Sequence, residues 1–482
     1  MENKYRYLSK NVVLFTISNI GSKIITFLLV PLYTSYLSTQ EYGVIDFVGT
    51  LVSITLPVFT CCLESAILRF SLDENNKKDE VISSAVPIWL RAVIFSLLFC
   101  LVIFLLDVFN EYENILGFYF IMFLCSGLKE NLTSIYRGID RVEVMVETSI
   151  ISSVTVCLLN IIFLTIFHMG MSGYILALIV SSIICIIWGS YRVRIISYIK
   201  ISKINKKLCR EIQNYGGPMI FNQIGWWLNN SLDKYIVIYF LGMSQNGIYS
   251  IAYKIPTILS ILSTIFSNAW SLSVIKEYDS NDAGEFATRM YKLYNALLVL
   301  CCSALLVVNV PIAKFLFANE FFAAWEISGI LVVSVIFNGL SGFLGSFFAA
   351  AKDTKSYAIS TITGGIINVI VSFCLVQIIG IKGVAIGTLI SYVFIWVIRY
   401  RKCRKYITLK NPMRKEISLY VLLVLECMVG LKGFSVGIIC VQLLIFVVLL
   451  LLNINEFKML FLQLFGALTK NMRRKKNGKI SD

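Results

Sequence analysis

The sequence predicts an all-α polytopic membrane protein, and its composition, the length of its apolar runs and their pattern each support that fold class. Of the 482 residues, 57% are hydrophobic and only 15% are charged. A helix of about 20 apolar residues crosses the hydrocarbon core of a bilayer, and apolar runs of that length recur along this chain. The runs are continuously apolar, which distinguishes them from the alternating strands of a membrane β-barrel.

Fourteen expected membrane-spanning helices follow one another in chain order. The first follows the basic residues 1–10, and its apolar run is too long for a cleavable signal peptide, so we expect it to be a spanning helix. The expected spans are 11–35, 42–68, 83–106, 115–137, 146–168, 172–194, 215–241, 247–273, 292–317, 325–350, 357–379, 383–399, 415–433 and 436–453. The connections 380–382 and 434–435 are very short, so twelve or thirteen helices are alternatives.

The connecting segments alternate between two compositions. Every second one lacks lysine and arginine, as in 36–41, 107–114, 169–171, 242–246 and 318–324. The intervening segments carry the basic residues, and basic connections lie on the cytoplasmic side of membrane proteins. We therefore expect both termini in the cytoplasm, which agrees with an even number of helices.

An internal repeat relates the two halves of the chain. The string SNIGS at 18–22 aligns with NQIGW at 222–226, about 204 residues later. The same spacing pairs Gly43 with Gly247 in the segments that follow. The first pair of helices is therefore expected to recur as the seventh and eighth.

A second match, GYILALIVS at 173–181 with GVAIGTLIS at 383–391, completes two copies of a six-helix unit. We expect an N-lobe over 1–200, a C-lobe over 201–410, and two appended helices with a basic tail over 411–482. Because six is even, the two lobes share one orientation and are parallel repeats. Transporters with such repeats bind their substrate between the repeats and alternate its access.

Lys23 lies near the middle of the first apolar run, where a charge costs about 2.5–3.5 kcal/mol on insertion scales. With Thr16, Asn19 and Thr26 it follows 3, 4, 3 spacing and shares one helical face. We expect this stripe to line a wet cavity, because lipid offers no partners for polar groups. The alternative is that Lys23 pairs with an acid on a neighbouring helix and only fixes the packing.

Three further cations, Arg91, Lys129 and Lys254, lie inside expected spans. Together with Lys23 they predict a cationic cavity. Such a cavity suits a phosphate-bearing ligand, because arginine makes bidentate contacts with phosphate and lysine supplies a point charge.

A second polar stripe runs along the seventh helix, where Asn222, Trp226, Asn230 and Lys234 follow one another at i, i+4 steps. We assign Asn222, Trp226 and Asn230 to the substrate path. Asp233 precedes Lys234 directly, and a locally neutralised pair is the alternative interpretation for these two residues.

Three acids, Glu64, Glu130 and Asp233, also lie within expected spans. They are interpreted either as counterions of the cations or as carriers of a coupling proton or Na⁺. The sequence does not choose between these two roles.

No constellation of catalytic, metal-binding or nucleotide-binding residues is evident. The sole histidine, His168, is expected at an outer helix end, and the sequence contains no Walker loop or zinc-ligand cluster. We therefore expect neither an enzyme nor a bound metal or cofactor. The thirteen cysteines, most of them inside apolar spans, are expected to be free thiols.

The net charge of +15 is concentrated in clusters that flank the apolar spans. Residues 192–210 hold seven lysines and arginines and no acid, and residues 399–415 hold eight and no acid. Clusters at such positions set topology and contact the head groups of membrane lipids. Nucleic acid is therefore not an expected partner.

Six strings, in this order and at this spacing, resemble one known family. It is the polysaccharide-exporting branch of the multidrug/oligosaccharidyl-lipid/polysaccharide (MOP) superfamily, the Wzx-type flippases. The matching strings are LLVPLYTSYLSTQEYGVID (28–46), ESAILRF (64–70), SLDKYIVIYFLG (231–242), GIYSIAYKIPTILSIL (247–262), NAWSLSVIKEY (268–278) and AAKDTKSYAI (350–359).

The resemblance implies a MATE-like fold and translocation of an undecaprenyl-pyrophosphate-linked oligosaccharide across the bacterial inner membrane. It places the chain in the biosynthesis of O-antigen, lipopolysaccharide or capsule. Partners would be the lipid-linked glycan, membrane lipids and the polysaccharide polymerase or ligase, with a monomer as the functional unit. The cationic cavity would then hold the pyrophosphate, and an H⁺ or Na⁺ gradient would be the coupling source.

Two related transporters and one unrelated class are the alternatives. A multidrug antiporter of the same superfamily is expected to carry an acid in its first helix, where this chain has Lys23. A lipid II flippase would have a similar cationic cavity. A membrane scaffold without transport activity would not need repeated halves with polar interior stripes.

Overall fold

The computed structural model of the protein describes most of the chain between residues 21 and 458. The described residues are 21, 23–73, 75–107, 114–277, 282–351, 353–407, 409, 413–456 and 458. Asn19, one of the predicted site residues, lies outside them.

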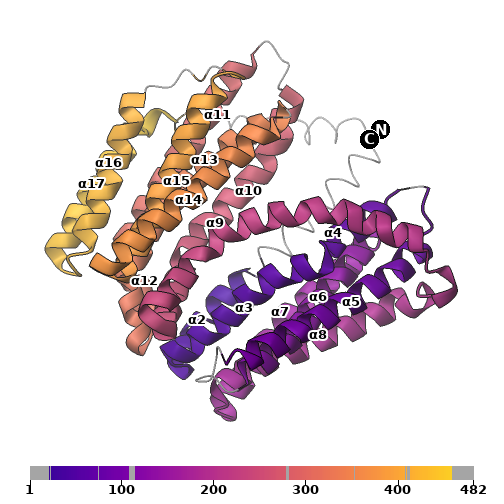
Figure 1. Ribbon diagram of the computed structural model, residues 1–482. Helices are drawn as coiled ribbons and strands as arrows, with labels where there is room; N and C mark the ends of the chain where they lie inside the picture. The colour runs from indigo at the N-terminus through magenta and orange to yellow at the C-terminus, as the bar shows by residue number, and fades with distance from the viewer. Residues whose placement is uncertain are drawn as a thin grey trace, which may run out of the picture. The chain divides into compact units, whose positions relative to one another are not determined.

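Every regular element of the described residues is a helix (Figure 1). The elements are α2 (Val30–Tyr36), α3 (Thr39–Thr60), α4 (Leu63–Ser71), α5 (Lys78–Leu105), α6 (Ile115–Gly138), α7 (Val142–Ile161), η1 (Ile162–Ile166), α8 (Gly170–Val193), η2 (Ile195–Ser197), η3 (Ile201–Lys203), α9 (Lys206–Ala252), α10 (Lys254–Glu277), α11 (Ala283–Val307), α12 (Asn309–Leu316), η4 (Asn319–Ala323), α13 (Ala324–Ala350), α14 (Thr354–Ile379), α15 (Ile381–Cys403), α16 (Met413–Gly430) and α17 (Val436–Leu452). The predicted all-α fold is confirmed.

Nine helices of the described residues are long and apolar enough to cross a membrane. A tenth span results if the bent pair Lys206–Ala252 and Lys254–Ser267 is counted as one. Two shorter apolar helices, Lys23–Tyr36 and Val436–Leu452, accompany them. These helices agree with the predicted multi-pass membrane protein, whereas the count of fourteen stays a prediction.

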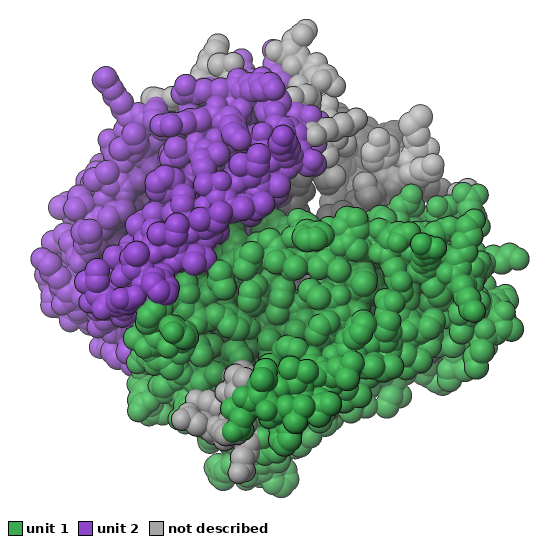
Figure 2. Space-filling model, viewed as in Figure 1, with its two compact units in different colours: residues 1–251, 316–321 green, residues 252–315, 322–482 purple. Residues whose placement is uncertain are grey.

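The chain forms two compact units, which Figure 2 shows in two colours. Unit 1 comprises residues 1–251 and 316–321, and unit 2 comprises residues 252–315 and 322–482. These units are defined by packing, whereas the expected lobes were defined by an internal repeat. The expected lobe boundaries therefore stay a prediction.

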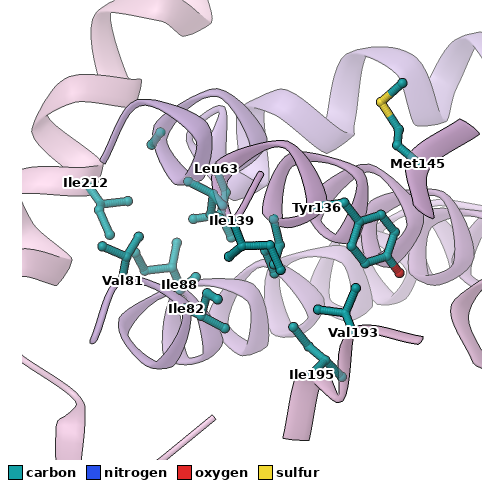
Figure 3. Close-up of a cluster of buried hydrophobic side chains, with 14 of the residues drawn as sticks. Leu63, Val81, Ile82, Ile88, Tyr136, Ile139, Met145, Val193, Ile195 and Ile212 are labelled. Carbon is teal, nitrogen blue, oxygen red and sulfur yellow. The ribbon is translucent and has the colours of Figure 1, made fainter. Parts of the chain in front are cut away.

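An apolar cluster holds the helices of unit 1 together where α4, α5 and α6 converge. Figure 3 shows Leu63, Ile82, Ile88 and Ile139 gathered between these helices, and all four are buried. Burying an aliphatic side chain of this size stabilises a fold by about 1.5–3 kcal/mol. Tyr136 extends the cluster toward α8.

α9 is bent, and the bend directs its last residues across α3. The backbone at Gly242 leaves helical geometry with φ 86° and ψ 176°, a region that glycine enters without a Cβ clash. A Cβ on Gly43 would lie 1.9 Å from the carbonyl oxygen of Met243, and one on Gly247 would lie 2.0 Å from that of Thr39.

This crossing is reciprocal in the sense of the internal repeat. Gly43 and Gly247 are 204 residues apart, and so are Thr39 and Met243. Gly43 therefore faces the carbonyl of Met243, and Gly247 faces the carbonyl of Thr39, which occupies the corresponding position 204 residues earlier. Small residues at a helix crossing let two backbones approach this closely.

Unit 2 is built around α13, which packs against α10, α11, α15 and α16. Of the 18 residues in the most apolar stretch of Asn319–Ala350, the segment that contains α13, 83% are buried. The aromatic rings of Trp270 and Phe343 stack with centroids 4.2 Å apart and join α10 to α13. α14 and α15 form a closely packed hairpin beside them (Figure 1).

Candidate functional site

A cavity of about 480 Å³ lies within unit 1 between α4, α6 and α8. Its polar lining consists of Glu64, Ser126, Lys129, Glu130, Thr133, Ser134 and Ser182. Three of the predicted site residues are thus brought together in one cavity.

The face that α6 presents to this cavity follows from helical periodicity. Ser126, Lys129, Glu130, Thr133 and Ser134 follow one another in steps of three, one, three and one residue, which keeps them on one side of the helix. The helix therefore presents an ammonium, a carboxylate and three hydroxyls together. Lipid could not satisfy such a set, so this face is expected to be hydrated.

Lys129 is held in place by hydroxyl groups of the next two helices. Its Nζ donates a hydrogen bond to Ser152 Oγ of α7 at 2.7 Å. Ser152 Oγ lies 3.3 Å from Ser181 Oγ of α8, and Ser181 Oγ also lies 3.1 Å from the carbonyl oxygen of Ser152. No acid lies within ion-pair distance of Lys129 among the described residues.

The two carboxylates reach the cavity from different helices. Glu64 lies in the first turn of α4, and the two residues before this helix, Cys61 and Cys62, have φ angles of 54° and 50° that separate α4 from α3. Its Oε1 accepts a hydrogen bond from Ser65 at 2.8 Å. Together with Glu130, it gives this cavity two acids for one lysine, so the cavity is mixed in charge rather than purely cationic.

Arg91 lies on α5 and does not line this cavity. Its guanidinium faces the Gln213 amide of α9, whose oxygen, when turned toward it, accepts from Nη2 at 2.8 Å and from Nη1 at 3.0 Å. The ring of Phe95 lies 6.0 Å from the guanidinium carbon. The structure thus places Arg91 in helix packing within unit 1.

The interpretation of Asp233 and Lys234 as a locally neutralised pair is wrong. Lys234 Nζ forms an ion pair with Asp46 Oδ1 of α3 at 2.8 Å. The Asp233 carboxylate is buried and accepts a hydrogen bond from the Tyr249 hydroxyl at 2.8 Å. Neighbouring residues on a helix point to different sides, so each found a partner elsewhere in unit 1.

Asp46 is a residue that sequence reasoning missed. It ends the string at 28–46, and Lys234 belongs to the string at 231–242, so two of the strings that carry the resemblance meet in this ion pair. Asn246 of α9 donates a hydrogen bond to the carbonyl of Gly43 at 3.0 Å, on the same helix as Asp46. The position of Asp46 in a matched string was the available signal.

The other predicted site residues lie apart from the cavity lining. Lys23 is exposed, as are Asn222 and Asn230 on α9, and the Trp226 side chain is 44% exposed. Asn230 donates to the Trp226 carbonyl at 2.7 Å. Lys254 is half-buried at the beginning of α10 in unit 2.

Arg399 of unit 2 was expected in a basic cluster at the membrane surface, and that expectation is wrong. The residue is 4% exposed on α15. Its guanidinium donates to Ser360 Oγ at 2.9 Å, to the Ser341 carbonyl at 2.8 Å and to Thr361 Oγ1 at 2.8 Å. It thereby ties α13 and α14 to α15 through neutral oxygens.

Comparisons with known proteins agree with the helical architecture. The family described as polysaccharide biosynthesis protein matches residues 8–271, more than half of the chain. The probable low-salt glycan biosynthesis flippase Agl15 of Haloferax volcanii is 21% identical over 412 residues, which are 84% of this chain and 85% of that relative.

Two solved structures share the fold. The lipid II flippase MurJ, in an inward closed conformation, superimposes with a TM-score of 0.66 at 15% identity and covers 94% of this chain and 100% of its own. A multidrug resistance MATE family transporter of the MOP superfamily, in an inward-facing conformation, gives a TM-score of 0.62 at 13% identity and covers 85% and 98%.

Proposed function

The chain belongs to the polysaccharide biosynthesis protein family, and we propose that it flips undecaprenyl-pyrophosphate-linked oligosaccharide repeat units across the bacterial inner membrane. It is a multi-pass helical membrane protein with the fold of MOP-superfamily flippases and transporters. A curated relative named as a glycan biosynthesis flippase supports a lipid-linked glycan as the substrate class. The flipped unit would enter O-antigen, lipopolysaccharide or capsule synthesis.

The observation that carries this proposal is the charged cavity inside the helices of unit 1. Intramembrane ionisable residues that face a cavity mark pathways for substrates or ions, because burying them in lipid is costly. Lys129 lines the cavity and forms no ion pair within the described part of the chain, although Glu64 and Glu130 line the same cavity. This lysine is the group that we propose to meet a phosphate there. A scaffold protein would have no need of such a cavity.

We assign the two kinds of charge to two roles. Lys129 and Lys23, with Arg91 and Lys254, are proposed to attract the pyrophosphate, and Asn19, Asn222, Trp226 and Asn230 to contact the substrate along its path. Glu64, Glu130 and Asp233 are proposed to balance the cations or to carry a coupling H⁺ or Na⁺. Alternating access between an N-lobe (1–200) and a C-lobe (201–410) would move the substrate.

Deletion and complementation test the proposal. We expect that a strain without this protein loses surface polysaccharide and accumulates undecaprenyl-linked intermediates on the cytoplasmic face. Wild type restores export, Lys129→Arg restores part of it, and Lys129→Ala does not, at equal amounts of protein in the membrane. The same series at Lys23, with Lys207→Ala as a control on an exposed helix surface, tests the first helix. Unchanged glycan after deletion would overturn the proposal.

The coupling role is tested separately in proteoliposomes. Glu64→Gln and Glu130→Gln each remove a negative charge with little change in size. If these acids carry the coupling ion, transport by the variants loses its dependence on an imposed H⁺ or Na⁺ gradient. If they are counterions, the dependence stays and only the affinity for the lipid-linked substrate changes.

A lipid II flippase is the second candidate, and the MurJ superposition over 94% of this chain is the observation that favours it. Complementation of a strain depleted of its lipid II flippase distinguishes the two, since only the second candidate restores growth.

A multidrug antiporter, suggested by the MATE superposition, would instead change resistance to cationic drugs. The flippase proposal also includes a monomeric functional unit, both termini in the cytoplasm and contact with a polymerase or ligase.

A further inference from the structure

Residues 194–206, here named the α8–α9 connector, are fixed to the first turns of α5 in unit 1. The backbone N–H of Lys200 donates to Ser83 Oγ at 2.9 Å. The backbone N–H of Asn205 donates to Ser84 Oγ at 3.1 Å. Because these bonds hold the backbone of the connector, they also fix the directions in which its side chains point.

The cations of this region divide into two groups. Lys203 pairs with Asp79 of α5 and helps to fix the connector. Arg194, Lys206 and Arg210 are exposed and form no ion pair within the described residues. Attachment to α5 thus leaves a positive surface without a partner from unit 1.

The isoleucines of the connector also divide into two groups. Ile195 is 6% exposed and packs into the apolar cluster of unit 1. Ile196 is 84% exposed and Ile201 is 86% exposed, and Ile199 and Ile204 are 41% and 37% exposed. Exposure of apolar surface to water is unfavourable by about 25 cal/mol per Å², and a fixed backbone prevents these side chains from folding inward. They need an apolar environment outside the protein.

We propose that the α8–α9 connector is a docking surface for anionic phospholipids of the bilayer. Segments that combine exposed aliphatic side chains with lysine and arginine lie at the boundary between head groups and acyl chains. Ile196 and Ile201 enter that boundary, and Arg194 and Lys206 contact the lipid phosphates. Charge complementarity selects anionic lipid over zwitterionic lipid. This surface is separate from the transport cavity and does not depend on the proposed function.

Lipid selection by the full-length protein is the first test. The purified protein is equilibrated with an equimolar mixture of phosphatidylglycerol and phosphatidylcholine, and the retained lipids are counted by native mass spectrometry. We expect Arg194→Gln/Lys206→Gln to bind phosphatidylglycerol about fivefold more weakly for each removed cation. The matched control, Lys314→Gln/Lys432→Gln, removes the same charge from exposed residues of unit 2 and should retain wild-type selectivity.

Equal loss of phosphatidylglycerol in both double variants, or no loss in either, would overturn the proposal. The thermal stability of both variants in neutral lipid shows whether they fold as the wild type does. Because the readout is lipid binding, a failure here leaves the transport proposal standing, and a failure of transport leaves this one standing.

Insertion of the isoleucines is tested by depth. A nitrobenzoxadiazole label is placed at Ile201→Cys in a protein in which the exposed Cys374 and Cys440 are serine. We expect quenching by phospholipids brominated near the head-group end of the acyl chain. The control label at Lys207→Cys, on the exposed beginning of α9, should respond to aqueous iodide. Quenching of the Ile201 label by iodide alone would contradict insertion.

Discussion

Two three-helix groups that the predicted repeat would relate are α6–α7–α8 in unit 1 and α13–α14–α15 in unit 2, and they have one similar helix contact. In the first, Ser181 Oγ donates to the carbonyl of Ser152 at 3.1 Å. In the second, Ser391 Oγ donates to the carbonyl of Gly364 at 2.7 Å. Ser181 and Ser391 are the last residues of the two matched strings, so in both groups the hydroxyl at this string position joins the third helix to the second.

The two groups differ in what surrounds their cation. Lys129 faces a cavity of about 480 Å³, whereas Arg399 is enclosed by neutral oxygens and by the ring of Tyr357, 4.1 Å from its guanidinium carbon. In α6, 28% of the most apolar window is buried, against 83% in α13. α16 packs against α13 and α11 in the second group. The three-helix group of unit 1 therefore borders a cavity at Lys129, whereas the group of unit 2 is closely packed around Arg399.

The largest expected effect is the loss of Arg399. Arg399→Ala removes three hydrogen bonds from a buried cation and leaves their oxygens without donors. We expect a loss of about 3–5 kcal/mol in the free energy of unfolding, measured by denaturant titration in detergent. Arg401→Ala, an exposed neighbour, should stay within about 0.5 kcal/mol of wild type. A loss below about 1 kcal/mol at Arg399 would show that unit 2 is not sealed around this residue.

Close packing of the second group is tested at Gly387. A Cβ there would lie 2.2 Å from Ser372 Oγ and 3.0 Å from its backbone nitrogen. We expect Gly387→Ala to destabilise the protein by about 1–3 kcal/mol. Gly365→Ala on α14 meets nothing within 4 Å and should stabilise by up to about 1 kcal/mol through helix propensity. Opposite signs from the two alanines would confirm the packing difference, and equal signs would argue against it.

Lys129→Ala should affect stability less than either of these core changes. Its bond to Ser152 borders the cavity, where water replaces the lost donor, so we expect a loss of about 1 kcal/mol. The same denaturant titration measures it. A loss as large as that of Arg399→Ala would mean that the first group is as sealed as the second, and it would remove the argument for a transport role.

The smallest effect concerns the loop between α13 and α14, outside the spanning helices. The Tyr406 hydroxyl donates to Asp353 and lowers the pKa of that carboxyl to about 2. The ionised form is favoured in the folded state, so its contribution to stability is present above the ordinary aspartate pKa of about 4 and is lost as pH falls through about 2.

Tyr406→Phe removes the donor and tests this linkage. Its difference in thermal stability from wild type should be constant above about pH 5 and should shrink between about pH 4 and pH 2. Thermal unfolding over that range in an acid-stable detergent measures it. A difference that grows on acidification would contradict the assignment to Asp353.

The membrane helices and several charged residues could be predicted from local pattern. Run length and apolarity are properties of contiguous residues, so α5, α6 and α8 begin and end close to their expected spans. Lys129, Glu64 and Glu130 were identified because a charge inside an apolar run needs a special environment wherever the helix packs. The glycine pair 43 and 247 was found by repeat spacing alone, and the structure gives it a shared contact.

Partner choice could not be predicted in this way. Sequence proximity offered Asp233 as one alternative partner of Lys234, yet Lys234 pairs with Asp46, 188 residues away, because α3 and α9 cross there. Arg399 stood in a run of surface cations, and only the packing of α13 and α14 around it shows that it is buried.

The sequence by itself determined the class of the protein, the approximate course of its helices and which charges would need an explanation, since each depends on apolar runs and periodicity within a helix. Only the tertiary structure decided that one cation borders a cavity while another is sealed, and which acid meets which base. The physical reason is that hydration and ion pairing depend on neighbours brought together from distant parts of the chain. Their identity is fixed by the helix crossings and not by the local pattern.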